Sequence, residues 1–237
     1  MNIAVVTTET LHHCYFLREL ARICPPAVVL AQRNGARPPF DTHHPFEDRR
    51  DEYERQTWFE GADAHLADFA QTIEVDSAND SQALKHLARA QPHIVVLFGA
   101  GRIGQPVIDV CPEGIVNLHG GDPEEYRGLD SHLWATYHGD FDSIVTTLHR
   151  VNARIDDGEI VSQAPVPLGG DMLLHELRSR NTRVCIELMR SALEAFGSTG
   201  RFHSRPQRKR GRYYSFMPGV LKETCEVRFA HHAGGRS

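Results

Sequence analysis

The sequence predicts an α/β fold: a Rossmann-like, mostly parallel sheet flanked by helices, followed by a short C-terminal tail. Two observations support this class. Short apolar runs alternate along the chain with segments of helical periodicity, and this alternation is typical of a parallel sheet. The length of 237 residues suits one α/β domain of ordinary size with a small appendage. We therefore expect one domain over residues 1–199 and a tail over residues 200–237.

The expected strands are short runs that are either apolar throughout or alternating. Residues 2–7 (NIAVVT) form the first, residues 93–98 (HIVVLF) are the most hydrophobic, and residues 143–151 alternate as a strand does. In chain order, the expected strands span residues 2–7, 27–30, 71–75, 93–98, 114–119, 143–151 and 160–167.

The expected helices fill the intervals between these strands. Residues 11–23 have helical spacing and end at a Cys-Pro-Pro sequence, which stops a helix. The polar stretch over residues 34–60, with prolines near its start and the charged run EDRRDEYER, is expected to be an insertion that ends in a helix. Asp171 is expected to cap a long amphipathic helix that ends near residues 196–197. The remaining expected helices span residues 81–90, 104–110 and 130–138.

Composition argues against several classes of protein. The net charge of -5 and the isoelectric point near 6.3 give no reason to expect a duplex nucleic acid partner. The first residues lack the pattern of a secretion signal, and no stretch approaches the roughly 18 apolar residues of a membrane span. The five cysteines are scattered and contain no Cys-x-x-Cys pair, so no disulfide framework is indicated. We expect a cytoplasmic protein without a membrane partner.

Residues that can carry chemistry gather in three loops, each after an expected strand. The first is Gly99-Ala100-Gly101-Arg102-Ile103, the second runs from Asn117 to Gly128 (NLHGGDPEEYRG), and the third from Arg154 to Glu159 (RIDDGE). In open α/β sheets, ligands bind outside the carboxyl ends of the strands. Glycines in the first loop would let the backbone approach a flat ligand closely, because no Cβ intervenes. Taken alone, the second and third loops are more typical of ordinary turns.

Three side chains from these loops form a plausible catalytic set. Asn117 and His119 are two residues apart on a strand, so their side chains point to the same side. An amide N–H beside a protonated imidazole suits a developing oxyanion. A carboxylate placed against that imidazole, such as Asp156, favours its charged form and fixes its orientation.

The motif NLHGGDPEEYRG, followed some forty residues later by IDDGEI, resembles the formyltransferase family. Members share an N-x-H, a proline-containing loop ending in YRG, and an L-D-T-G-D-I segment. The resemblance implies that Asn117, His119 and Asp156 are catalytic, that N10-formyltetrahydrofolate is the formyl donor, and that a primary amine is the acceptor. Two departures from the family pattern stand out: Gly121-Asp122-Pro123-Glu124 replaces the usual S-L-L-P, and Asp157 replaces a threonine. The first touches a loop near the acceptor in relatives, so it bears on the identity of the acceptor.

The resemblance also implies binding residues. The folate-binding positions are Phe98, Gly99, Gly101, Arg102, Ile103, Asn152, Ile155 and Asp157. The positions near the acceptor are Gly120, Gly121, Tyr126, Arg127 and Gly128. No metal site is expected, because the histidine pairs lack acidic or cysteine partners at ligand spacing. These pairs are His12-His13, His43-His44 and His231-His232.

The identity of the acceptor stays open between several alternatives. Some forty residues after the domain do not accommodate the C-terminal domain of a methionyl-tRNA formyltransferase, so initiator tRNA is not expected. Glycinamide ribonucleotide remains possible on size, although the insertion and the tail are not expected of that minimal enzyme. A nucleotide-linked amino sugar is favoured, with hydroxyornithine or another amino acid of a siderophore pathway as the alternative. A folate-binding module without turnover and hydrolysis of the donor also remain open.

The tail is rich in cationic and aromatic side chains. The sequence RPQRKRGR, from Arg205 to Arg212, either contacts a pyrophosphate or forms a solvated surface. Tyr213, Tyr214 and Phe216 either stack on a base or pack the tail onto the domain or onto a second subunit, and packing is favoured. A homodimer is therefore possible.

Overall fold

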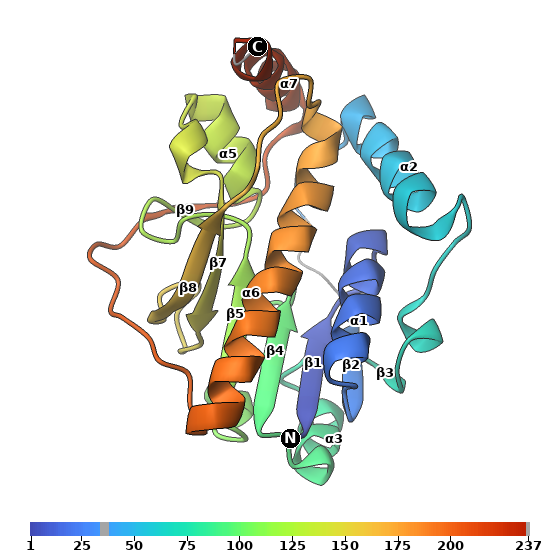
Figure 1. Ribbon diagram of the computed structural model, residues 1–237, viewed down its shortest axis with the longest axis vertical. Coiled ribbons are helices and arrows are strands. Elements are labelled where there is room, and N and C mark those ends of the chain that lie inside the picture. Colours follow the sequence, from blue (N-terminus) through green and yellow to red (C-terminus); the bar gives the residue numbers. More distant parts are fainter. Residues whose placement is uncertain (34–37, 236–237) are drawn as a thin grey trace.

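The computed structural model describes residues 1–33 and 38–235 (Figure 1). Its centre is a seven-stranded sheet in the order β3-β2-β1-β4-β5-β7-β8. The first five strands in this order are parallel, whereas β7 pairs antiparallel with both β5 and β8. The predicted fold class, a mostly parallel sheet, is confirmed. The strands are β1 (Ile3–Thr7), β2 (Val28–Gln32), β3 (Thr72–Val75), β4 (Ile94–Phe98), β5 (Ile115–His119), β7 (Val145–Arg150) and β8 (Ile160–Pro165).

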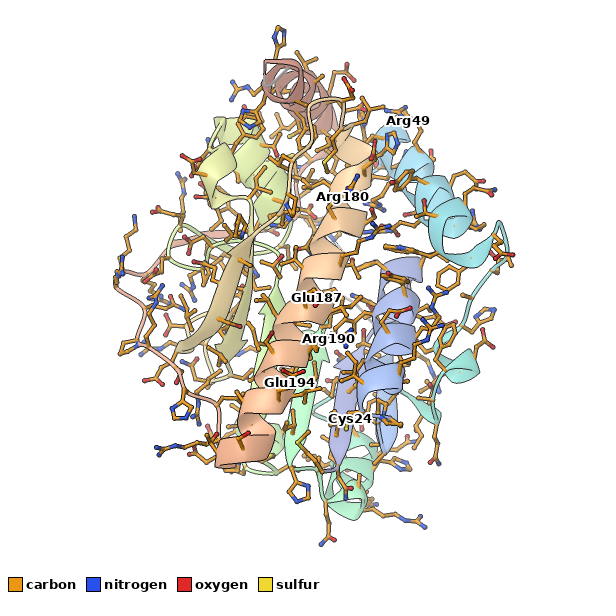
Figure 2. All side chains as sticks on the ribbon, viewed as in Figure 1. Cys24, Arg49, Arg180, Glu187, Arg190 and Glu194 are labelled. Atoms are coloured by element: carbon orange, nitrogen blue, oxygen red, sulfur yellow. The ribbon has the colours of Figure 1, made fainter. Side chains whose placement is uncertain are left out.

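Helices cover both faces of this sheet. On one face, α1 (Leu11–Ile23) and α6 (Leu177–Thr199) bury side chains against β1, β4 and β5, and in Figure 1 both helices cross in front of the sheet. On the other face, α3 (Ser81–Ala90) and α4 (Gln105–Ile108) form a second core. Because β1, β2 and β4 are buried on both sides, their sequences are apolar at nearly every position. The outward side of α6 carries Arg180, Glu187, Arg190 and Glu194 (Figure 2).

Two expected helices differ from those observed. The helix expected over residues 104–110 is only the single turn α4. The expectation that Asp171 caps the long helix is wrong: Asp171 lies in a turn, a 3-10 turn η3 (Leu174–Glu176) follows, and α6 begins at Leu177. Instead, the Glu176 carboxylate accepts the backbone N–H of Leu173 at 3.3 Å. The acid that caps this helical segment therefore lies three residues after Leu173, the residue that precedes η3.

The expected insertion ends in α2 (Pro45–Phe59), as its charged sequence indicates. Residues 34–37, at its beginning, lie outside the described residues. Two further short 3-10 turns, η1 (Leu66–Asp68) and η2 (Phe141–Ser143), precede β3 and β7. The helix expected over residues 130–138 is α5 (Ser131–His138).

The tail is built into the domain rather than solvated. Its strand β9 (Arg212–Tyr214) pairs in parallel with β6 (Tyr126–Gly128), the YRG sequence of the second loop. Its helix α7 (Gly219–Gly234) packs on α5, where Cys225 and Phe229 join a third apolar core with Phe46 of α2. None of the described helices is long and apolar enough to span a membrane.

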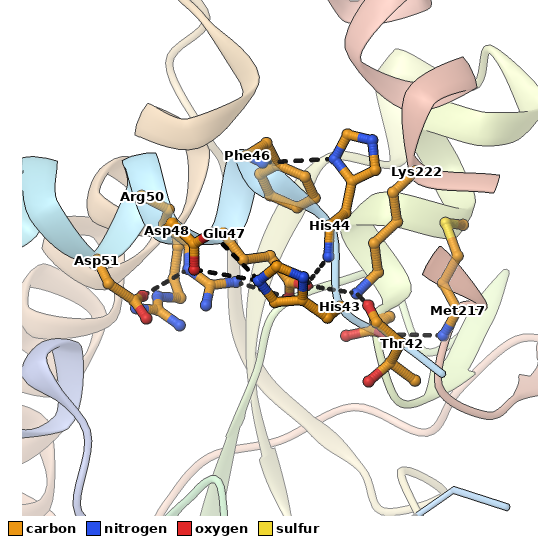
Figure 3. Close-up of polar contacts among 12 residues, drawn as sticks. Thr42, His43, His44, Phe46, Glu47, Asp48, Arg50, Asp51, Met217 and Lys222 are labelled. Atoms are coloured by element: carbon orange, nitrogen blue, oxygen red, sulfur yellow. Dashed lines mark hydrogen bonds and ion pairs between the residues drawn. The ribbon is translucent and has the colours of Figure 1, made fainter. Parts of the chain in front are cut away.

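A buried lysine joins α7 to the insertion. Lys222 is 2% exposed, and its ammonium lies 3.0 Å from a carboxylate oxygen of Glu47 at the start of α2. It also donates to the carbonyl of Thr42 at 2.5 Å (Figure 3). A buried ammonium is costly without such partners, so this pair fixes the position of α2 against the tail.

Candidate active site

A cavity of about 570 Å³ opens at the carboxyl ends of β4 and β5. Residues from all three loops picked out in the sequence line it, and Asn117, His119 and Asp156 are among them. Helices α1 and α2, the starts of α5 and α6 and Tyr213 of the tail supply most of the remaining lining. The predicted catalytic side chains therefore share one cavity, as the strand spacing indicates.

The carboxylate of Asp156 is the point where the loops meet. Its Oδ2 accepts the backbone N–H of Gly128 at 2.7 Å and lies 3.6 Å from Nδ1 of His119. Its Oδ1 lies 3.5 Å from Nδ2 of Asn117 and 3.4 Å from Nε2 of His149. The backbone of Asp156 is left-handed, with φ 49°, a conformation that aspartate tolerates better than most residues.

His149 belongs to the site although the sequence analysis does not single it out. It lies opposite Asn117 in the antiparallel β5–β7 pair. Its Nδ1 lies 2.7 Å from the carbonyl oxygen of Arg150, and its Nε2 lies 3.0 Å from the amide nitrogen of Asn117 and 3.4 Å from Oδ1 of Asp156. The available signal is the alternation of residues 143–151, which puts His149 on one face of the strand just before the Asp156 loop.

His119 is held by two oxygens. Its Nε2–H donates to the carbonyl of Tyr126 at 2.9 Å. Its Nδ1 faces Asp156 at 3.6 Å, beyond hydrogen-bonding distance but close enough for attraction between charges. The ring is 6% exposed, so its orientation is set by these contacts rather than by water.

Asp156 is ionised by its surroundings. Burial alone would raise the pKa of its carboxyl, but the charge on His119 and the contacts with His149 and Gly128 outweigh burial and hold the pKa well below its usual range. A carboxylate with so low a pKa is a weak base and a strong electrostatic partner.

The first loop presents backbone to the cavity. Phe98, Gly99, Gly101, Arg102 and Ile103 all line it, as do Asn152 and Ile155 of the third loop. A Cβ on Gly101 would have no described atom within 4 Å, so the space beside this glycine is open. Gly99 has φ +70°, and a Cβ there would lie 2.3 Å from the ring of His13, so Gly99 is required for backbone geometry and packing.

Four of the predicted binding residues do not line the cavity. Asp157 pairs with Arg154 at 3.5 Å and with Arg210 at 3.2 Å. Arg127 donates to the carbonyl of Ile155. Their role in the described structure is to hold the third loop.

The two other predicted residues outside the lining, Gly121 and Tyr126, hold the second loop. The Gly121 carbonyl accepts the hydroxyl of Thr147 at 2.7 Å, and Tyr126 contributes its carbonyl to His119. Only Gly120 and Gly128 of the predicted acceptor set line the cavity itself.

The basic tail is paired with acids of the loops. Arg205 binds Glu124 through two contacts of 2.9 and 3.0 Å, and Lys209 binds Glu125. Neither cation lines the cavity. The structure therefore gives no support to a pyrophosphate contact by this run, because these charges neutralise the acids of the DPEEYRG loop.

One tail residue reaches the catalytic loop directly. The Gln207 amide donates to the carbonyls of Asp156 at 3.0 Å and Gly158 at 2.9 Å. Of the tail aromatics, Tyr214 stacks on Tyr126, and Tyr213 lines the cavity. The packing role expected of these aromatics is observed for Tyr214.

Of the histidine pairs, one lines the cavity and one has acidic neighbours. Burial lowers the pKa of His13 to about 3 and that of His12 well below its usual value, so both rings are neutral. His44 lies 3.2 Å from Glu223 and 3.8 Å from Glu226, acidic neighbours that sequence spacing does not reveal. The guanidinium of Arg49 already pairs with Glu226, which disfavours a metal ion there.

Fold and site together define a Rossmann-like α/β protein with an Asn-His-Asp site at the carboxyl edge of its sheet. A sequence model described as formyl transferase matches residues 19–193, which include all three site residues. The chain belongs to the formyl transferase family.

Individual relatives extend this finding. A methionyl-tRNA formyltransferase from Porphyromonas gingivalis is 28% identical over 157 residues, 65% of this chain and 48% of that protein. The chain thus spans about half the length of the curated relatives it matches.

Two solved structures share the fold. A sugar N-formyltransferase from Shewanella sp. has a TM-score of 0.62 at 12% identity and covers 97% of this chain and 88% of its own. The formyltransferase PseJ from Anoxybacillus kamchatkensis, in complex with UDP-4,6-dideoxy-4-formamido-L-AltNAc and tetrahydrofolate, has a TM-score of 0.55 at 16% identity. It covers 91% of this chain and 86% of its own. At these identities the likeness shows the fold alone.

The lowered pKa of Asp156 leads to a first prediction. We expect its carboxyl to stay ionised while an ordinary aspartate, with a pKa of about 3.9, becomes protonated. Because the folded-state pKa is the lower one, the stabilisation it provides is complete above about pH 4 and is lost as the pH falls through the folded-state pKa. Carbon NMR of the carboxyls measures this, with exposed Asp109 as the internal reference; a midpoint for Asp156 at or above that of Asp109 would contradict it.

Proposed function

We propose that the protein transfers a formyl group from N10-formyltetrahydrofolate to a primary amine of a small molecule, best described as a nucleotide-linked amino sugar. The observation that carries the proposal is the convergence of Asn117, His119 and Asp156 on one cavity in a chain of the formyl transferase family. Neighbouring folds supply further support, since one of them was crystallised with tetrahydrofolate and a formylated sugar nucleotide.

The donor loop fits a flat ligand. The open space beside Gly101 lies where no side chain of the described residues intervenes, and the N–H of Gly101 is held by Gln32 at 3.1 Å. Asn79 braces the same loop from behind, since it donates to the Arg102 carbonyl at 2.7 Å and accepts the Gly104 N–H at 2.6 Å. A rigid backbone edge with an open face suits a pteridine ring.

N10-formyltetrahydrofolate supplies an activated formyl group when it is bound. Attack by the acceptor's amine leaves negative charge on the formyl oxygen, and the site offers two donors to receive it. Nδ1 of His119 is the ring nitrogen without a hydrogen bond in the described structure, and Asn117 is oriented by His149. Loss of one such donor typically costs ~3–4 kcal/mol of transition-state stabilisation.

Asp156 acts in this scheme as an electrostatic partner. Its low pKa makes it a poor acceptor for the amine's proton, and its carboxylate lies 3.6 Å from Nδ1 of His119. Its bond to the Gly128 N–H also ties the second loop to the third, so the same side chain sets both charge and geometry. The amine's proton then passes through water or through another group of the cavity to N10 of the donor, so that the bond between the formyl carbon and N10 breaks and tetrahydrofolate leaves.

The acceptor assignment is tested by a panel of amines. We expect tetrahydrofolate release to depend on a nucleotide-linked amino sugar such as the deformylated form of the sugar nucleotide bound by PseJ. Initiator methionyl-tRNA belongs in the panel, because the curated relatives are methionyl-tRNA formyltransferases. Glycinamide ribonucleotide and hydroxyornithine complete it. Formate release without any acceptor would indicate hydrolysis, and folate binding without turnover would indicate a binding module; either result overturns the proposal.

The catalytic set gives the second prediction. We expect His119→Ala and Asp156→Asn each to lower kcat by about a hundredfold or more, because each removes ~3 kcal/mol of stabilisation from the transition state. Since the two residues act together, the double variant should lose much less than the product of the single losses.

Exposed residues outside the cavity supply the controls for this test, His203→Ala and Asp109→Asn, which should match the parent. Steady-state kinetics and thermal melting together decide the outcome. Losses below fivefold at unchanged melting temperature would remove His119 or Asp156 from the chemistry.

The donor loop gives the third prediction. Gly101→Val fills the open space beside the loop without meeting protein atoms, so we expect the donor KM to rise by about tenfold or more while the melting temperature stays constant. Gly169→Val, at an exposed glycine where a Cβ also has no described neighbour within 4 Å, is the matched control. Equal changes in donor and acceptor KM, or none, would place the donor elsewhere.

A further inference from the structure

We propose that Asp130 binds the amino group of the acceptor in its ammonium form before transfer, an inference that rests on the proposed function for the nature of the ligand. The bound ammonium gives up one proton to water before the neutral amine attacks the formyl carbon. Asp130 follows the YRG strand β6 and precedes α5, and it lines the cavity. It faces the wall made by α2 and the tail, whereas the donor loop Gly99–Ile103 forms a different wall. Its carboxylate differs from the other charged groups near that wall in the groups that contact it.

The backbone fixes where this carboxylate lies. Asp130 has φ 51°, in the left-handed region, and its Oδ2 accepts the backbone N–H of Met217 at 2.8 Å. A tail residue therefore holds one oxygen in place. No hydrogen bond from the described residues reaches the other oxygen, Oδ1, so it remains available to the cavity.

The cations around Asp130 are already paired with other acids. Lys222 of α7 lies 3.0 Å from Glu47, and Arg50 of α2 lies 3.0 Å from Asp51 and 3.3 Å from Glu47 (Figure 3). In the part of the chain that the structure describes, no lysine, arginine or histidine nitrogen comes within 4 Å of the Asp130 carboxylate.

A third cation near this wall, Arg178 of α6, is also paired. It donates to both carboxylate oxygens of the fully buried Glu54, at 2.8 and 2.5 Å, and to Asp51 at 2.7 Å. Arg50, Lys222 and Arg178 therefore each have an acidic partner other than Asp130.

Such an arrangement calls for a cation from outside. Asp130 is half-buried. Partial removal of a carboxylate from water without a cation costs free energy, and burial accordingly raises the pKa of Asp130, although the Met217 N–H and the more distant Lys222 and Arg50 oppose that rise. Glu47 adds to the rise. An incoming ammonium would restore neutrality and complete the hydrogen bonding of Oδ1.

The cavity lining also fits the body of an amino sugar. Apolar side chains of α2, α5, η3 and α6, together with the residue after β6, line the cavity, where a sugar ring can pack beside a charged contact. They are Phe46, Leu129, Leu133, Leu174 and Leu177. Arg50 and Arg178 line the cavity as well, but both are paired with acids of α2.

The test separates charge from the structural bond to Met217. Asp130→Asn keeps an oxygen for the Met217 N–H and removes only the charge. With the acceptor found by the panel, we expect its KM to rise about ten- to hundredfold, with kcat within threefold and the donor KM unchanged. Asp109→Asn, an exposed acid outside the cavity, controls for loss of charge alone and should match the parent.

A second measurement does not require turnover. Cyclohexylammonium chloride should raise the melting temperature of the parent and shift the NMR signal of the Asp130 carboxyl, while cyclohexanol of the same shape should not shift that signal. In Asp130→Asn the effect of cyclohexylammonium should fall to that of cyclohexanol. Equal effects of the amine on both proteins, or no effect on the parent, would overturn the inference.

The two measurements keep the proposals separate. If no acceptor in the panel is formylated but cyclohexylammonium binding depends on Asp130, the formyl-transfer proposal fails and the ammonium site stands. If formyl transfer is found and Asp130→Asn leaves the acceptor KM unchanged, the formyl-transfer proposal stands and the ammonium site fails.

Discussion

The Asp156 carboxylate is the contact on which the geometry of the site depends. It joins a strand, β5, to two loops by facing Asn117, His119 and the Gly128 N–H at once. These groups lie far apart in sequence, so they meet only because β7 pairs antiparallel with β5 and returns the chain to the same edge of the sheet. The left-handed backbone at Asp156 turns the carboxylate toward both histidines. Its low pKa follows from this placement, because a buried carboxylate between two imidazoles is stabilised in its charged form.

The tail maintains this arrangement from outside the region matched by the family model. The Gln207 amide donates to the carbonyl of Asp156. Strand β9 pairs with β6, the YRG strand that supplies the Gly128 N–H. Arg205 and Lys209 neutralise the two glutamates of the second loop, which would otherwise repel each other and Asp156. Three cations of the basic run, Arg205, Lys209 and Arg210, are thus paired with acids of this same chain. A charge run can look like a ligand site in sequence and serve as a structural counter-charge in the fold.

The sequence could predict what periodicity and local motifs encode. Every strand of the main sheet and the convergence of Asn117, His119 and Asp156 follow from alternation and from the rule that ligands bind at strand ends. His149 was missed because its role depends on strand register, which sequence spacing alone does not define. Helix α7 was missed although Leu221, Cys225, Phe229 and Ala233 recur every four residues, because the basic run before it suggested a solvated tail. The charged groups around Asp130 come from α2, α7 and the start of α5. Pairing between elements so far apart in the sequence leaves no pattern within any one segment.

Two walls of the cavity differ in composition, since one is mostly backbone and the other mostly side chains. This difference determines how much family membership implies about each ligand. The wall that we propose for the donor consists largely of backbone and glycine, held from behind by Gln32 and Asn79, a composition suited to recognition of shape. The wall that we propose for the acceptor consists of side chains from α2, α5 and α6, with α2 positioned by Lys222. Side-chain walls change recognition with each substitution, because each charge must be paired in the complex. Membership of the family therefore says more about the donor chemistry than about the acceptor, and the Asp130 carboxylate is the group by which we propose that this chain discriminates among amines.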